Sequence, residues 1–174
     1  MIYIRGCMDG RKKDYMSDYV LFYRDERPTI AGHSFSDILA FSDDQLEREH
    51  MYIQWLFPNR KLSQMQPGAA TEPFTDEAAE EMLDDDIVVA RIGLAVQMML
   101  RFWGIQWNGN TVRVVDKERF AAKLGRVNHN QLRMTRMLEF LRCLEWSALI
   151  DDIRAELQAN IAGQKRAMGF WMAV

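Results

Sequence analysis

The chain has 174 residues, of which 48% are hydrophobic and 27% are charged. These proportions are those of an ordinary globular protein, and they exclude a collagenous, mucin-like or wholly disordered chain. The formal net charge of −3 gives no support for a protein that coats DNA by overall charge. We expect one domain over residues 1–174, because a chain of this length can bury a sufficient core.

The chain start and the cysteines predict an intracellular, cytoplasmic protein. Charged residues interrupt the first thirteen positions, so they contain no apolar run of the length that a secretory signal needs. Cys7 and Cys143 form no CxxC motif and are expected to be free thiols, and we expect no metal site and no cofactor. The apolar stretch 87–105 contains Arg91 and Arg101, which are costly in lipid, and predicts a buried helix instead of a membrane span.

Helical patterns dominate the first half of the chain, after an N-terminal extension over residues 1–19. Residues 34–37 form a capping box that predicts a helix through Phe41, and a second capping box begins a helix over 42–57 that Pro58 stops. The proline-containing segment 58–73 predicts a long loop. A long helix is expected from Thr75 to Phe102.

The second half contains short elements and two further helices. A turn is predicted at 108–110 and an extended piece at 111–115. Capping residues predict helices from Asp116 to Leu124, from Asn128 to Glu145 and from Ser147 to Ala162. The tail over 163–174 contains Phe170, Trp171 and Met172, and it is expected to pack on the body or to mediate association. The predicted fold is all-α, one compact orthogonal bundle of several helices around the 75–102 helix.

Charge is unevenly distributed along the chain. Residues 72–86 hold eight acidic residues and no basic one. Acidic residues at a helix start are stabilised by the helix dipole, and a divalent cation site or a protein partner at this segment are the alternatives. Residues 111–142 hold eight basic and three acidic residues, which makes nucleic-acid binding a further hypothesis.

A first polar stripe lies on the predicted 42–57 helix. Glu47, His50 and Gln54 fall within about 60° of one another on a helical wheel, beside the apolar core stripe. A carboxylate beside an imidazole can fix its tautomer, so we expect Glu47 to act on His50. The stripe is either a hydrogen-bonded network that fixes helix packing or part of a ligand pocket.

A second polar stripe begins at the start of the predicted 128–145 helix. His129, Arg133, Arg136 and Phe140 share one face, and free backbone N–H groups at a helix start attract anions. The alternative is that these arginines pair with the acidic segment or with Glu47. If both stripes form one pocket, their side chains must lie well within about 15 Å of each other, because cooperation needs hydrogen-bond distances or one bridging water. The candidate ligand-binding residues are Glu47, His50, Gln54, Arg60, His129, Asn130, Arg133 and Arg136.

Three strings resemble the N-terminal domain of the opioid growth factor receptor family. Residues 50–58 read HMYIQWLFP and are similar to the family string HxYIQWLFP. Residues 98–105 and 129–138 are similar to MMLxFxGI and HNxLRxTRxL. The resemblance covers about residues 20–157, and it includes both polar stripes.

The resemblance implies a receptor-like binding role. The animal member is described as a receptor for a growth-inhibiting enkephalin peptide, is associated with nuclear membranes and lacks receptor-like transmembrane helices, which implies peripheral membrane association. This sequence lacks the repeat-rich C-terminal part and the basic nuclear-import tracts, and it looks like a minimal, microbial version of the domain.

We therefore favour a binding module for a peptide or a small anionic ligand at a pocket lined by His and Arg. One alternative is an enzyme acting on a phosphate-containing substrate, with Glu47 and His50 as the base and His129 beside the arginine clamp. The sequence contains no P-loop or nucleophile motif that would support this chemistry. The second alternative is nucleic-acid binding through residues 111–142.

Overall fold

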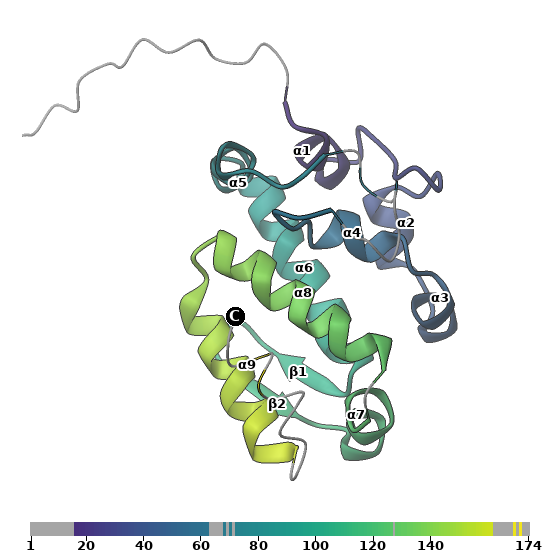
Figure 1. Cartoon of the computed structure of the whole chain (residues 1–174), viewed down its shortest axis with the longest axis vertical. Coiled ribbons are helices and arrows are strands. Elements are labelled where there is room, and N and C mark those ends of the chain that lie inside the picture. Colours follow the sequence, from purple (N-terminus) through teal and green to yellow (C-terminus); the bar gives the residue numbers. More distant parts are fainter. Residues whose placement is uncertain are drawn as a thin grey trace, which may run out of the picture.

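The protein is described here by a computed structural model that covers residues 16–62, 68, 70, 72–126, 128–161, 169 and 171. Within these residues the chain is mostly helical and includes one two-stranded hairpin (Figure 1). The elements in chain order are α1 (Asp18–Tyr23), α2 (Phe35–Leu39), α3 (Asp43–Arg48), α4 (Tyr52–Leu56), α5 (Asp76–Leu83), α6 (Asp86–Phe102), β1 (Ile105–Trp107), β2 (Val112–Val114), α7 (Lys117–Leu124), α8 (His129–Cys143) and α9 (Ser147–Asn160).

Helix α6 runs through the middle of the molecule, with α8 in front of it in the view of Figure 1. Its buried side includes Val88, Ile92 and Met99, all fully inaccessible, while Ile87 and Leu94 are exposed on the other side. Helices α1 and α5 lie at one end of the molecule, and α7 and the hairpin lie at the other. Within the described residues, no helix is long and apolar enough to cross a lipid bilayer.

Local capping chemistry places several helix starts where the sequence predicts them. Both capping boxes are present: Ser34 with Asp37 begins α2, and Ser42 with Gln45 begins α3. Asp116 caps α7 through the backbone N–H of Arg119. These side chains satisfy backbone donors that would otherwise have no partner in the first helical turn.

The single helix predicted over 42–57 is wrong, because the chain forms α3 and α4 with a break between them. Glu49 adopts an extended conformation (φ −76°, ψ 139°) and ends α3. No proline or glycine lies at the break. The cause is a long-range contact to the carbonyl groups there, described below.

The single helix predicted from Thr75 to Phe102 is also wrong. Helix α5 ends at Leu83 and α6 begins at Asp86. The Asp85 carboxylate accepts hydrogen bonds from the backbone N–H groups of Ile87 and Val88, and it forms an ion pair with Arg24. The acidic run therefore supplies two helix starts instead of one.

The side-chain cap predicted at Ser147 is not formed. Helix α9 begins at Ser147, and the residue before it, Trp146, makes no capping hydrogen bond through its side chain.

The described residues are mostly helical, as the all-α prediction states, and the hairpin is a small addition to it. β2 confirms the extended piece predicted at 111–115, and it pairs with β1, a strand not predicted from the sequence. Ile105 pairs with Val114, and Trp107 pairs with Val112. On the outer edge of β2, the backbone N–H of Val114 donates to the Glu156 carboxylate of α9 at 2.8 Å.

Trp171, one of the described residues of the 163–174 segment, packs on the body. Its side chain is fully buried, and its indole N–H donates to the Gln131 carbonyl at 3.3 Å. Arg154 donates to the Trp171 carbonyl at 2.9 Å. Cys7, Phe170 and Met172 lie outside the described residues.

A substitution at Gly104 tests the tight connection between α6 and the hairpin. Its φ is +80°, and a Cβ there would lie 2.5 Å from the Asp116 carbonyl oxygen. Gly109 also has a positive φ, but a Cβ there would meet nothing within 4 Å. We expect Gly104→Ala to lower the free energy of unfolding by about 3 kcal/mol and Gly109→Ala by about 1 kcal/mol, as measured by urea denaturation. Equal effects would contradict the packing of Gly104 described here.

Candidate functional site

A cavity of about 540 Å³ lies between α4, the segment that follows it, and α8. Its walls combine charged, amide and apolar side chains: His50, Ile53, Gln54, Asn59, His129, Leu132, Arg133, Thr135, Arg136 and Glu139. The residues of α8 that line it recur every three or four positions, so they lie along one side of the helix.

The two predicted stripes meet in this cavity. The rings of His50 and His129 lie 5.2 Å apart between centroids and are nearly perpendicular. This separation is well inside the 15 Å limit that cooperation requires. His50 lies in the break between α3 and α4, and His129 is the first residue of α8.

Arg133 joins the break to α8. Its side chain is buried, and its Nη1 donates to the Leu46 carbonyl at 2.8 Å while its Nη2 donates to the Glu49 carbonyl at 2.7 Å. Carbonyl groups at the end of a helix have no partner within the helix, and they attract cations. Arg133 therefore caps α3 from a distance of more than 80 residues along the chain and stabilises the break that the local sequence does not predict.

The guanidinium of Arg133 also forms hydrogen bonds with the side chains of Asn130 and His50. Nη1 also donates to Asn130 Oδ1 at 3.2 Å, and Nη2 lies 2.9 Å from His50 Nδ1. Because a guanidinium can only donate, His50 Nδ1 must accept, and in this geometry the imidazole proton is on Nε2. Burial lowers the pKa of Arg133, and the guanidinium lies over the Tyr52 ring, which favours a cation.

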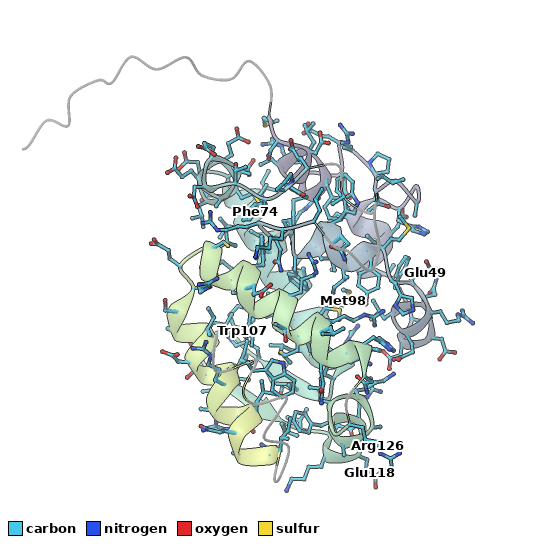
Figure 2. The ribbon with its side chains drawn as sticks, in the orientation of Figure 1. Glu49, Phe74, Met98, Trp107, Glu118 and Arg126 are labelled. Carbon is cyan, nitrogen blue, oxygen red and sulfur yellow. The ribbon has the colours of Figure 1, made fainter. Side chains whose placement is uncertain are left out.

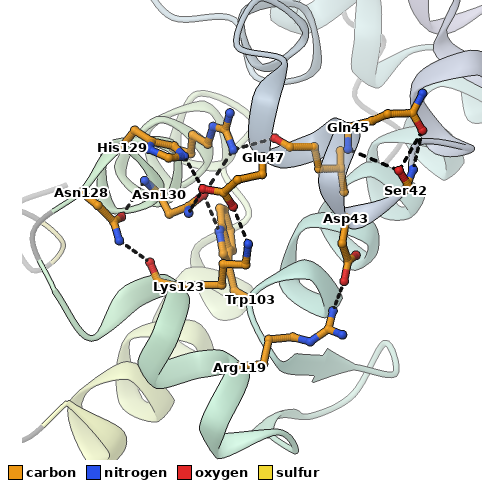
Figure 3. A network of polar contacts seen from close by, with 12 residues as sticks. Ser42, Asp43, Gln45, Glu47, Trp103, Arg119, Lys123, Asn128, His129 and Asn130 are labelled. Carbon is orange, nitrogen blue, oxygen red and sulfur yellow. Dashed lines mark hydrogen bonds and ion pairs between the residues drawn. The ribbon is translucent and has the colours of Figure 1, made fainter.

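Glu47 contacts His129 and not His50, which corrects the predicted pairing. Figure 3 shows its carboxylate between α3, α7 and α8, where it binds the Lys123 ammonium. Asn130 donates to it at 3.4 Å. Burial raises the pKa of Glu47, but the hydrogen bond and charge of Lys123, with help from His129, outweigh burial and hold that pKa below its usual value.

Opposing electrostatic effects act on the pKa of His129. Its Nε2 lies 2.8 Å from a Glu47 oxygen without the alignment of a hydrogen bond, so the attraction is electrostatic. Burial and the charge of Arg133 lower the pKa of His129, and Glu47 only partly opposes them. His129 is therefore harder to protonate than an ordinary histidine.

Arg136 presents donors that the protein does not use. Its Nη1 donates to the Phe57 carbonyl at 3.2 Å, and burial lowers its pKa. Within the described residues, its Nε and Nη2 make no hydrogen bond, and no carboxylate lies within 4 Å of either Arg133 or Arg136. One buried and one half-buried guanidinium charge thus lack a contacting counter-ion, which favours a positive potential in the cavity.

Two further polar side chains in the cavity also have spare hydrogen-bonding capacity. Gln54 is only 6% exposed, and its side chain has no hydrogen-bond partner among the described residues. Asn59 donates to Glu139, but its buried Oδ1 has no partner there. Sequence reasoning missed Asn59 and Glu139, although Glu139 lies three residues after Arg136 on the same stripe and could have been found by extending it.

Other predicted site residues do not line the cavity. Arg60 forms an ion pair with Asp76 at the start of α5, and Asn130 is buried behind the cavity wall, where Trp103 donates to it at 3.4 Å. Phe140 belongs to the core and contacts the ring of Phe74, which Figure 2 labels near α5.

The basic segment 111–142 does not form one cationic face. Arg113, Arg119 and Lys123 pair with Glu156, Asp43 and Glu47 respectively. Arg126 and Glu118, of opposite charge, both extend from the region of α7 (Figure 2). Three of the eight basic residues of this segment are therefore paired with acidic groups from other elements.

The cap that Arg133 supplies can be tested by stability measurements. Arg133→Met leaves the Leu46 and Glu49 carbonyls without their donor, and we expect it to lower the free energy of unfolding by about 2 kcal/mol or more. Arg142→Met, at an exposed position of the same helix, should change it by no more than about 0.5 kcal/mol. Two variants of equal stability would show that the guanidinium does not stabilise the break.

The lowered pKa of His129 predicts a pH dependence. A group that is harder to protonate when folded favours the folded state above its unfolded pKa of about 6.5, and that contribution is lost as the pH falls through the folded pKa. Between pH 7.5 and 5.5, urea denaturation should show a larger loss of stability for the wild type than for His129→Gln. This window lies above the titration of Glu47, and an identical loss in both proteins would contradict the prediction.

Comparison with known proteins agrees with the three sequence strings. The family model described as the opioid growth factor receptor conserved region matches residues 14–155. The chain is 38% identical over 132 residues to the opioid growth factor receptor of Mus musculus, which covers 69% of this chain and 20% of that protein. It is 36% identical over 101 residues to opioid growth factor receptor-like protein 1 of Rattus norvegicus, which covers 56% of this chain and 21% of that protein.

The chain thus spans about a fifth of the length of these relatives. No solved structure matches it. Because the family model covers most of the chain, including both polar stripes and the whole lining of the cavity, the chain belongs to the opioid growth factor receptor conserved-region family.

Proposed function

We propose that this chain is a binding module that takes a small anionic ligand, or an anionic group of a peptide, in the cavity between α4 and α8. The observation that carries the proposal is the pair of guanidinium groups of Arg133, which is buried, and Arg136, which is half-buried, neither with a carboxylate in contact. An uncompensated buried cation is costly, and a bound anion would offset that cost. Relatives that are named as receptors support a ligand-binding role.

The two arginines have different tasks in this proposal. Both terminal nitrogens of Arg133 are occupied by groups of the protein, so it supplies charge and positions His50. The Nε and Nη2 groups of Arg136 are available to donate hydrogen bonds directly to a bound anion. His50 Nε2–H adds a neutral donor on the cavity wall.

Titration calorimetry with inorganic phosphate, acetate, glutarate and short acidic peptides tests the proposal. We expect saturable binding of at least one of these probes by the wild type. Arg136→Gln should weaken it at least tenfold, since it removes a charge-assisted contact. Arg142→Gln, at an exposed position of the same helix, is the matched control and should bind like the wild type. If Arg136→Gln binds as tightly as the wild type, the cavity is not the anion site.

An enzyme acting on a phosphate-containing substrate is the second candidate, and the close pair of His50 and His129 favours it. An imidazole whose Nδ1 accepts from Arg133 can donate a hydrogen bond from Nε2 to a bound phosphate. Phosphodiesterase and nuclease assays separate this function from simple binding. Activity that is present in the wild type and lost in His50→Ala would support it, and equal rates in both proteins would argue against it.

A further inference from the structure

The end of the cavity at Arg136 carries two opposite charges that do not contact each other. Arg136 and Glu139 lie three residues apart on the same side of α8, and both line the cavity. Within the described residues they form no ion pair within 4 Å, and Glu139 instead accepts a hydrogen bond from Asn59. Both charges are therefore available to a ligand.

Hydrogen-bond donors and acceptors without partners lie together at the Arg136 end of the cavity. Arg136 offers Nε and Nη2 as donors, while the buried Oδ1 of Asn59 lacks a donor. Gln54, more than nine-tenths buried and without a partner among the described residues, adds one amide that can donate and accept. A simple anion would satisfy the donors and leave the acceptors unpaired beside a carboxylate, which is unfavourable.

A group that carries a carboxylate and an ammonium on one carbon matches this arrangement. The guanidinium fork binds a carboxylate through two parallel hydrogen bonds. An ammonium donates three hydrogen bonds, and the Asn59 carbonyl and the Glu139 carboxylate can accept them. The chemistry is that of a free α-amino acid.

The other end of the cavity selects the side chain of such a ligand. Arg133 precedes Arg136 by three residues, which is about 4.5 Å along the helix axis, and His50 contacts Arg133. A side chain of two or three methylene groups spans that distance. A negative group at its tip would meet the His50 Nε2–H donor and the charge of Arg133.

We propose that this cavity binds a free acidic α-amino acid, with its ammonium at Asn59 and Glu139 and its α-carboxylate at Arg136. The side-chain carboxylate faces His50 and His129. The inference rests on the proposed function, because it assigns a ligand class to the same cavity.

Calorimetry with matched compounds tests each subsite. L-Glutamate and L-2-aminoadipate carry all three groups and differ in side-chain length. Glutarate lacks the ammonium, 4-aminobutyrate lacks the α-carboxylate, and L-norvaline lacks the side-chain carboxylate. We expect the better of the two complete ligands to bind at least tenfold more tightly than each compound that lacks one group.

Glu139→Gln isolates the ammonium subsite and retains an oxygen that can accept from Asn59. We expect it to weaken binding of the complete ligand at least tenfold but not to weaken glutarate binding, because the carboxylate that is removed repels that dianion. Glu118→Gln, at an exposed position of α7, is the matched control. Circular dichroism and thermal unfolding check that both variants fold like the wild type.

Two outcomes overturn the amino-acid proposal without affecting anion binding. The first is equal affinity for glutarate and L-glutamate. The second is equal affinity for L-glutamate and its α-amide, which would assign the site to the N-terminal residue of a peptide. If the wild type binds neither these compounds nor the simple anions, the amino-acid proposal and the broader proposed function both fail.

Discussion

The buried guanidinium of Arg133 is the interaction on which the rest of this structure depends. It ends α3, holds the chain in an extended conformation at Glu49 and fixes the orientation of His50. Without it, residues 42–57 would have the local preferences of one continuous helix. A straight helix would not bring His50 to the first turn of α8, so the contact that stabilises the fold also forms the candidate site.

Burial lowers the pKa values of Arg133, Arg136 and His129, whereas Lys123 lowers that of Glu47 against the effect of burial. Glu47 pairs with Lys123, and its charge acts on His129 and Arg133 without forming an ion pair with either arginine of the cavity. Arg133 and Arg136 line a cavity of about 540 Å³. The protein therefore keeps a positive charge in a low-dielectric region, where interactions with an anion are stronger than in water.

Local chemistry in the sequence predicted much of this fold, and long-range contacts explain where prediction failed. Capping boxes at Ser34 and Ser42 marked helix starts correctly because they act within four residues. The break at Glu49 depends on Arg133, which is distant in sequence, so periodicity could not reveal it. The start of α6 at Asp85 is a local cap that lies within the acidic run and was not distinguished from its neighbours. The two histidine stripes were found as separate faces, but their contact required the folded chain.

Glu156 has a consequence for how the molecule behaves among its own copies. Its carboxylate occupies the outward N–H of Val114, on the strand edge that faces away from β1. An open edge of this kind is where a second chain can add a strand and begin aggregation. A charged side chain from α9 closes that edge, so the hairpin can carry an exposed Val115 beside it without becoming a template for intermolecular sheet growth.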